Sequence, residues 1–227
     1  MVETGLKMRF RLILRQALGH KSLFEVEFFS VYPYMFDPKQ LIFLTGCLAK
    51  TAQLTGSYLE VGCNRGATTV FLNKWTKSSG IAKRYVAIDT FSGFPEEQAE
   101  YEVTHRNKEP RVKMAFRENN RSWVQRSLRL CGVDDVDLIE ADATKFDYSS
   151  ISPIAFCLLD VDFYIPTSVD LPKIYENLAP GGVIVVDDCS AADPRWDGAL
   201  QAYSEFTQSA GLPMNVVCDR LGIIEKR

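Results

Sequence analysis

The amino-acid sequence predicts an α/β fold in which helices flank a mostly parallel, seven-stranded sheet. From residue 57 onward, short apolar runs alternate with amphipathic stretches, the pattern of parallel strands joined by crossover helices. Two of these runs, 154–160 and 183–187, are almost wholly apolar and then stop on aspartates. Strands buried on both faces have this composition, and their charged carboxyl ends mark the edge where such sheets bind ligands.

Residues 1–54 precede the first predicted strand and are expected to form a helical N-terminal appendage that serves as a cap or a subunit contact. Within it Pro33 and Pro38 bracket a cluster of Tyr32, Tyr34 and Phe36, for which core or subunit contact is favoured over a stacking platform. Residues 55–227 are expected to form the sheet domain. The predicted strands are 58–61, 85–89, 136–140, 154–160, 183–187, 214–218 and 222–225, and the predicted helices are 67–77, 121–131, 169–178 and 197–210.

Three segments between the predicted helices and strands carry further information about the fold. The third predicted helix runs into Ala179-Pro180-Gly181-Gly182, a strong stop signal. No helix separates the last two strands, so they should form an antiparallel hairpin on an otherwise parallel sheet. Residues 91–118 read as a long charged loop with little periodicity, and a functional lid is favoured over disorder because the loop directly follows a strand end.

Composition narrows the function. The chain has 227 residues, of which 46% are hydrophobic, and a formal net charge of -3 with mixed signs, which favours a small-molecule partner over nucleic acid. Its six cysteines include no C-x-x-C pair, as expected of reduced residues in a cytoplasmic protein. The basic N-terminal segment around Leu12-Ile13-Leu14 is too short for secretion, and no stretch predicts membrane insertion. An interfacial amphipathic helix there is the less favoured alternative to a cap.

Four aspartates stand at two strand ends: Asp160 and Asp162 follow one run, and Asp187 and Asp188 follow another. A single aspartate at each place would fit a helix cap. Two at each place raise one another's pKa unless a cation or a base intervenes, so the pattern favours a cation site. Because His20 and His105 are the only histidines, a histidine-based metal site or triad is nearly excluded.

The first strand leads into a glycine-containing turn, Gly62-Cys63-Asn64-Arg65-Gly66. Gly62 and Gly66 allow the backbone to approach a ligand and to start a helix, whose N-terminus attracts a carboxylate. A dinucleotide-binding turn needs its second glycine where Asn64 stands, which disfavours a pyrophosphate-binding loop.

Two more acids follow neighbouring strands. Asp89 ends the second strand, where it can accept both hydroxyls of a ribose, and Asp142 follows the third, where it can meet an adenine amino group. Capping a turn or a short helix is the alternative for each, and for Asp142 it is nearly as favoured. A ligand with a carboxylate, a ribose and an adenine satisfies all three places, and S-adenosylmethionine is such a ligand.

With these motifs the chain resembles the macrocin O-methyltransferase family, metal-dependent sugar O-methyltransferases of antibiotic pathways within the Rossmann-like class I methyltransferases. The similarity covers about three quarters of the chain. It rests on Glu60-x-Gly62-x-x-Arg65-Gly66, Asp89-Thr90-Phe91-Ser92-Gly93-Phe94-Pro95, Asp160-x-Asp162-x-Tyr164-x-x-Thr167, Pro180-Gly181-Gly182, Asp187-Asp188, and Gly198-Ala199 with Glu205-Phe206.

The resemblance implies roles for these residues. Asp160, Asp187 and Asp188 would hold a divalent cation, usually Mg²⁺, and Asp162 would be the general base on a hydroxyl of a sugar-bearing metabolite. The expected S-adenosylmethionine site then comprises Glu60, Gly62, Gly66, Asp89 and Asp142. At least a homodimer is also implied. Strand alternation further predicts that the Asp160 and Asp162 side chains share one side, about 6–7 Å apart along the chain.

The sequence departs from the family pattern at two positions, because Val161 and Ala67 stand where glycine is common. Two other functions remain as alternatives. A catechol-type O-methyltransferase normally has a lysine three residues after its first metal aspartate, where this chain has Phe163. A dehydrogenase-like or non-catalytic nucleotide-binding module is disfavoured by Asn64 and by the four acids. Trp196 fits a substrate wall and ordinary helix packing equally well.

Overall fold

The computed structural model describes residues 32–227. Phe36–Arg227 form one compact unit, and the last residues before it belong to a second unit, in which the rings of Tyr32 and Tyr34 meet edge to face at 5.4 Å. The basic segment near Leu12, for which an interfacial helix was weighed, lies outside the described residues.

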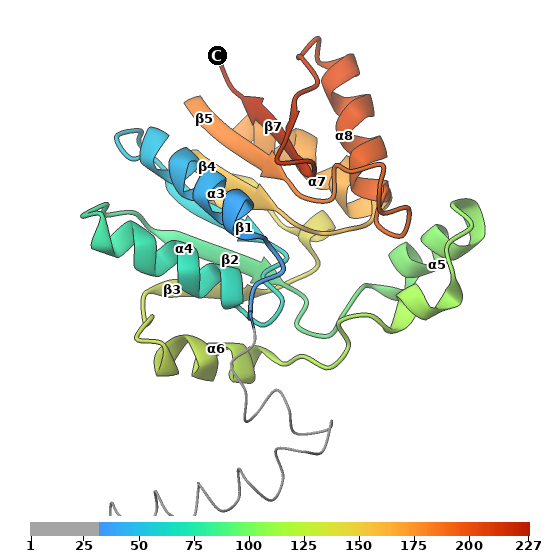
Figure 1. The fold of residues 1–227 in the computed structure, drawn as a ribbon, viewed down its shortest axis with the longest axis horizontal. Coiled ribbons are helices and arrows are strands. Elements are labelled where there is room, and N and C mark those ends of the chain that lie inside the picture. Colours follow the sequence, from blue (N-terminus) through green and yellow to red (C-terminus); the bar gives the residue numbers. More distant parts are fainter. Residues whose placement is uncertain (1–31) are drawn as a thin grey trace, which may run out of the picture. The chain divides into compact units, whose positions relative to one another are not determined.

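One seven-stranded sheet forms the centre of the compact unit, in the order β3-β2-β1-β4-β5-β7-β6 (Figure 1). The first five strands are parallel, and β7 runs antiparallel to both β5 and β6. The predicted α/β class, the strand count and the C-terminal hairpin are confirmed. The strands are β1 (Ser57–Val61), β2 (Tyr85–Asp89), β3 (Val136–Glu140), β4 (Ile154–Leu159), β5 (Leu178–Val186), β6 (Val216–Val217) and β7 (Leu221–Glu225).

Helices cover both faces of the sheet. On one face Leu171 of α7 and Ala199 of α8 pack into a core with Val86 and Ile88, while Ala87 turns to the opposite face, where α6 packs. This alternation along β2 is the period-two pattern of a strand buried on both sides. The helices are α3 (Pro38–Lys50), α4 (Ala67–Ser78), α5 (Glu96–His105), α6 (Arg121–Leu130), α7 (Tyr164–Asn177) and α8 (Gly198–Ser209).

Helix α3 begins at a capping box, in which the Asp37 carboxylate accepts from the Gln40 backbone and the Gln40 side chain accepts from the Asp37 backbone, each at 2.8 Å. The helix packs on α4, and the Tyr58 hydroxyl of β1 donates to the Leu48 carbonyl at 2.6 Å. Both elements belong to the compact unit. The domain boundary expected at residue 55 stays a prediction.

The expectation of an irregular loop over residues 91–118 is wrong. This segment contains α5 and a 3-10 helix at Pro110–Met114. Two of the three buried residues of α5, Gln98 and Glu102, are polar. The sequence of α5 therefore lacks the periodic apolar residues from which a helix is predicted. Helix α7 begins at Tyr164, five residues before its expected start. It can include Pro166 because this residue lies in the first turn, where the missing N–H of proline is not needed.

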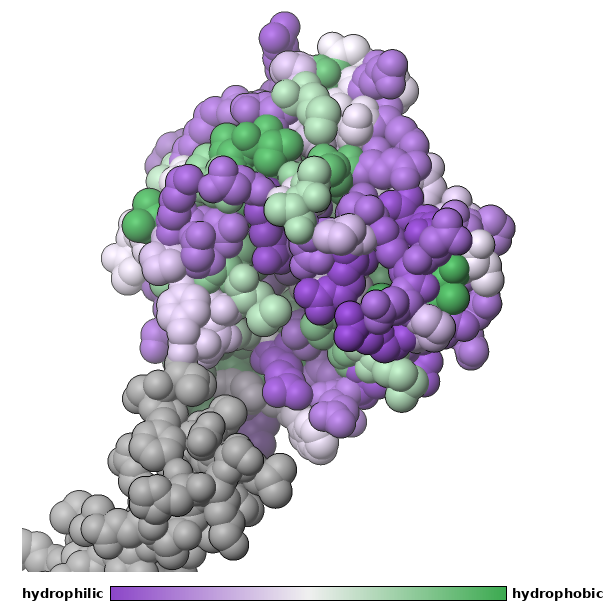
Figure 2. Space-filling model, turned by 45° about the vertical axis from the view of Figure 1, so that its right-hand side comes forward, coloured by the Kyte–Doolittle hydropathy of each residue, from purple (hydrophilic) through white to green (hydrophobic). Residues whose placement is uncertain are grey.

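The described surface shows no continuous apolar face in the view of Figure 2, where hydrophobic residues form small groups among hydrophilic ones. None of the helices in residues 32–227 is long and apolar enough to cross a membrane. All six cysteines are free, and four of them are buried.

Candidate active site

The strand order reverses between β1 and β4, since β2 and β3 lie on one side of this pair and β5 on the other. The ladder continues one residue past each strand: the Asp160 N–H donates to the Val61 carbonyl at 2.8 Å, and the Asp187 N–H donates to Leu159 at 2.9 Å. The two aspartates are therefore neighbours at the edge where α/β sheets bind ligands.

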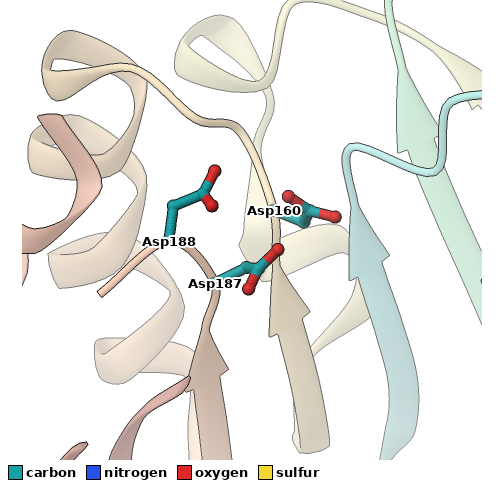
Figure 3. A group of neighbouring side chains, drawn as sticks. All are labelled: Asp160, Asp187 and Asp188. Carbon is teal, nitrogen blue, oxygen red and sulfur yellow. The ribbon is translucent and has the colours of Figure 1, made fainter. Parts of the chain in front are cut away.

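Asp160, Asp187 and Asp188 come together as predicted. Each offers a carboxylate oxygen, and the three oxygens lie within 4.8 Å of one another. Figure 3 shows the Asp187 side chain reaching from the end of β5 toward Asp160. Asp187 and Asp188 are buried, and Oδ2 of Asp188 has no hydrogen-bond partner among the described residues. Three converging carboxylate oxygens, from residues that include an aspartate with an unsatisfied buried oxygen, fit a small divalent cation such as Mg²⁺.

Burial raises the pKa of all four aspartates at this edge above the ordinary value. For Asp160 and Asp162 the charges of the neighbouring acids add to burial, and the pKa of Asp188 rises to about 7 through burial and the charge of Asp187. The guanidinium of Arg220 opposes each of these rises without cancelling it. The guanidinium therefore compensates only part of the negative charge of the four aspartates, and a bound cation would compensate more of it.

Arg220 is a site residue that the sequence analysis missed. Its Nε donates to Asp187 Oδ1 at 2.6 Å, its Nη2 donates to the other oxygen of Asp187, and the same nitrogen lies 3.0 Å from Asp188 Oδ1. The hairpin was predicted, but not that β7 would pair with β5. That pairing sets Gly222 opposite Val186 and so brings Arg220 beside the two acids.

Asp162 lies at the apex of a tight turn, so the geometric argument from strand alternation is wrong. Strand β4 ends at Leu159, and the Phe163 N–H donates to the Val161 carbonyl at 2.6 Å across Asp162, whose φ is 58°. A left-handed aspartate closing a three-residue turn is strained, a feature that concentrates at functional sites. Val161, which stands where the family commonly has glycine, packs against the core formed by α7, α8 and the sheet. An apolar side chain fills space there that glycine would leave empty.

The turn after β1 is built around two close approaches. A Cβ on Gly62 would lie 1.7 Å from the Asp160 carbonyl oxygen, so glycine is needed here for β1 and β4 to end side by side. The Asn64 N–H donates to Asp89 Oδ2 at 2.8 Å, and the Phe91 N–H donates to Oδ1 at 2.7 Å. Asp89 is thus held at the end of β2 by two backbone donors, with a further lone pair on each oxygen. Gly66 has a φ of 79° and starts α4.

Glu60 and Asp142 are both engaged within the protein. Glu60 is 1% exposed, and its Oε2 accepts from the Tyr85 hydroxyl at 2.9 Å. Asp142 caps the short helix that follows it by accepting from the Thr144 N–H at 3.1 Å, the alternative role weighed for it, and Nε2 of Gln98 in α5 donates to it at 3.2 Å. The Gln98 contact shows that α5 reaches the carboxyl edge of β3.

A buried ionic network connects α5 with the turn after β4, and no sequence pattern indicated it. Glu102, 1% exposed, accepts from the Tyr164 N–H at 2.7 Å and from Arg106 Nε at 2.9 Å. Arg106 and Lys108 each contact Asp197 at 2.6 Å. The Glu102 carboxylate thereby caps the N-terminus of α7, two residues after Asp162.

Aromatic side chains from three segments gather beside this turn. Phe94 stacks on Phe163 with the ring centroids 3.8 Å apart, and Trp196 lies 5.8 Å from Phe163 and 6.1 Å from Phe116. Trp196 therefore has packing partners, and a role as substrate wall stays a prediction. His105, which falls in the segment expected to be a loop, is exposed in the last turn of α5, where its ring stacks on Tyr101.

Asp170 of α7 leads to a prediction about pH. It is 0% exposed, neither carboxylate oxygen has a hydrogen-bond partner among the described residues, and burial raises its pKa to about 7. The folded state thus retains a proton that the unfolded chain releases near pH 4, so the stabilisation is present below pH 4 and is lost as the pH rises through 7. In EDTA, Asp170→Asn should raise the free energy of unfolding by about 1–3 kcal/mol at pH 8 and by much less at pH 5.

Urea denaturation at both pH values checks this prediction. The free energy of unfolding of the variant should still fall with rising pH, but less steeply than that of the wild type, because Glu60 also has a pKa raised to about 7 by burial. A variant that follows the wild-type pH dependence would show that Asp170 ionises normally.

The sheet order, with β7 antiparallel beside β5, is that of the α/β methyltransferase fold. The model of the macrocin O-methyltransferase family (TylF) matches residues 35–224. The chain belongs to this family, and it is an S-adenosylmethionine-dependent O-methyltransferase.

Solved structures share the fold. The O-methyltransferase NovP is 16% identical, with a TM-score of 0.69 over 85% of this chain and 81% of its own. CalS11, a calicheamicin methyltransferase, is 17% identical, with a TM-score of 0.68 over 98% of this chain and 92% of its own. A second structure of CalS11 is described as that of a TDP-rhamnose 3'-O-methyltransferase. An O-methyltransferase from Bacillus cereus in complex with SAH is 17% identical, with a TM-score of 0.52 over 86% and 82%. No curated protein matches the chain.

Proposed function

We propose that the enzyme methylates a hydroxyl group, on a sugar of a small glycosylated metabolite, with the assistance of a divalent cation. The observation that carries this proposal is the approach of three carboxylate oxygens within 4.8 Å at the ends of β4 and β5, next to a fourth aspartate in a strained turn. The sugar acceptor is supported by family membership and by the description of CalS11 as acting on TDP-rhamnose.

The cofactor would bind along the carboxyl ends of β1, β2 and β3. Gly62 and Gly66 shape the turn that receives its carboxylate at the start of α4, and Asp89 is held ready for the ribose hydroxyls by two backbone donors. Asp142 stands after the next strand, on the adenine side, in contact with Gln98. Glu60, at the end of β1 before this turn, is bonded to Tyr85 of β2.

The metal ligands would be Asp160, Asp187 and Asp188, with Mg²⁺ as the best match for their oxygen donors. When bound, such a cation lowers the pKa of an acceptor hydroxyl. Asp160 and Asp187 are fixed by backbone hydrogen bonds to the neighbouring strands, so their carboxylates need little rearrangement to bind.

Asp162 would accept the proton of the acceptor hydroxyl. Burial and the charge of Asp188 raise its pKa above the ordinary value, and a cation bound beside it would oppose that rise and favour the carboxylate form that can accept a proton. The turn and the Glu102 cap on α7 hold the backbone on both sides of Asp162, and methyl transfer depends on such positioning.

The alternatives are less well supported. Phe163, where a catechol-type enzyme normally has lysine, is 1% exposed and stacks on Phe94, so this position offers no cation to the site. A passive nucleotide-binding module does not need four acids at one edge. A homo-oligomeric, cytoplasmic enzyme that binds neither nucleic acid nor membrane remains part of the proposal.

Isothermal titration calorimetry with S-adenosylhomocysteine tests the proposal, with and without MgCl₂. We expect the nucleoside to bind in both cases, MgCl₂ to bind as a separate event, and NAD to give no heat. If S-adenosylhomocysteine does not bind, the cofactor site is wrong; if it binds but MgCl₂ gives no heat, the metal assignment is wrong.

A further inference from the structure

The backbone around Arg220 is tied directly to the proposed metal loop. Arg220 follows a turn whose two central residues, Cys218 and Asp219, have φ values of 51° and 62°. Its carbonyl accepts from the N–H of Cys189, the residue after Asp188, at 2.7 Å. The position of Arg220 beside the acids therefore results from main-chain pairing and does not depend on its side chain.

The guanidinium is the positive charge that the structure places on the cluster. It grips both oxygens of Asp187 and reaches Asp188, in the fork geometry that arginine offers to carboxylates. The ring of Phe36 lies 5.6 Å from the guanidinium carbon. Because arginine stays protonated in proteins, this charge is permanent.

One guanidinium cannot satisfy four acids. Asp160 and Asp162 have no ion-pair partner in the part of the chain that the structure describes, and Oδ2 of Asp188 has no hydrogen-bond partner there. The remaining oxygens still favour a divalent cation, but that cation would lie next to a fixed positive charge that shares two of its ligands. Like charges at such distances repel strongly in a partly buried site.

We propose that Arg220 is a built-in counter-ion that holds Asp187 and Asp188 in place while the metal site is empty and weakens metal binding once the cation enters. This inference rests on the proposed metal site. Arg220 is a positioning residue, and it sets the cation concentration at which the site fills. The guanidinium and the metal compensate the same negative charge, so each reduces the benefit of the other.

The test compares Arg220→Gln with the wild type by calorimetric titration with MgCl₂ and by melting in EDTA and in MgCl₂. We expect the variant to melt at a lower temperature in EDTA, because two buried carboxylates lose their partner. It should bind Mg²⁺ on the order of tenfold more tightly, because a repulsive charge is gone. The Mg²⁺-induced rise in melting temperature should therefore exceed that of the wild type.

Arg84→Gln is the matched control, since it removes the same charge from an exposed ion pair with Asp137 and should leave Mg²⁺ binding unchanged. If Arg220→Gln does not fold, Arg220→Lys, which keeps the charge but not the fork, should melt earlier in EDTA and keep wild-type Mg²⁺ affinity. Weaker or unchanged Mg²⁺ binding in Arg220→Gln, or tighter binding in Arg220→Lys, overturns the inference. If Mg²⁺ fails to bind the wild type, the proposed metal site itself is wrong, and the inference falls with it.

Discussion

Asp162→Asn is expected to lower kcat by about 10²–10⁴-fold, the usual contribution of a positioned general base. The amide has the shape of the carboxylate and can occupy the same turn, but it cannot accept the proton of the acceptor hydroxyl. Because asparagine tolerates left-handed backbone well, the φ of 58° at this position should not destabilise the variant. Transfer of a labelled methyl group from S-adenosylmethionine to a panel of sugar-bearing acceptors, TDP-sugars among them, measures the loss.

The same variant should bind S-adenosylhomocysteine and Mg²⁺ as the wild type does. Asp135→Asn, which removes an exposed carboxylate paired with Lys77, is the matched control and should keep full activity. Loss of Mg²⁺ binding in Asp162→Asn would reassign this residue as a metal ligand. Undiminished turnover would show that another group accepts the proton.

Asp160→Asn is expected to weaken Mg²⁺ binding by at least about 10–100-fold, since the loss of even a group behind a ligand has that effect. The Asp160 carboxylate is one of the three proposed metal ligands and follows the end of β4. The hydrogen bond from the Asp160 N–H to Val61 should keep the backbone at this strand end in place in the variant. Turnover should fall with metal occupancy and recover in part at high MgCl₂, and EDTA should abolish it in the wild type. Activity that survives complete chelation would contradict the metal role of all three aspartates.

The approach of the acids at this edge was predictable because its pattern is local, whereas the choice of Asp160, Asp187 and Asp188 over Asp162 came from the family resemblance. Two apolar runs end on Asp160 and on Asp187-Asp188, and parallel strands deliver their carboxyl ends to one edge, so only the adjacency of β4 and β5 had to be inferred. The hairpin of β6 and β7 followed from the short connection at residues 218–221 in the same way.

Features that depend on contacts between distant segments were not predictable. Arg220 reaches Asp187 only because β7 pairs with β5, and the sequence of a hairpin does not indicate which strand of the sheet it pairs with. Helix α5 buries Gln98 and Glu102 against other polar groups, so it lacks the apolar stripe by which helices are recognised. Asp162 leaves the strand pattern because a single hydrogen bond across it closes a turn, which overrides the alternation of β4.

The measurement that tests the metal-assisted mechanism most directly is an anomalous difference map from crystals grown with S-adenosylhomocysteine and MnCl₂, with Mn²⁺ standing in for Mg²⁺. We expect one strong peak bound by carboxylate oxygens of Asp160, Asp187 and Asp188 at roughly 2.0–2.3 Å, and a much weaker peak in crystals of Asp160→Asn grown at the same MnCl₂ concentration. A map without a peak between β4 and β5, in crystals where the nucleoside is bound, would contradict the account.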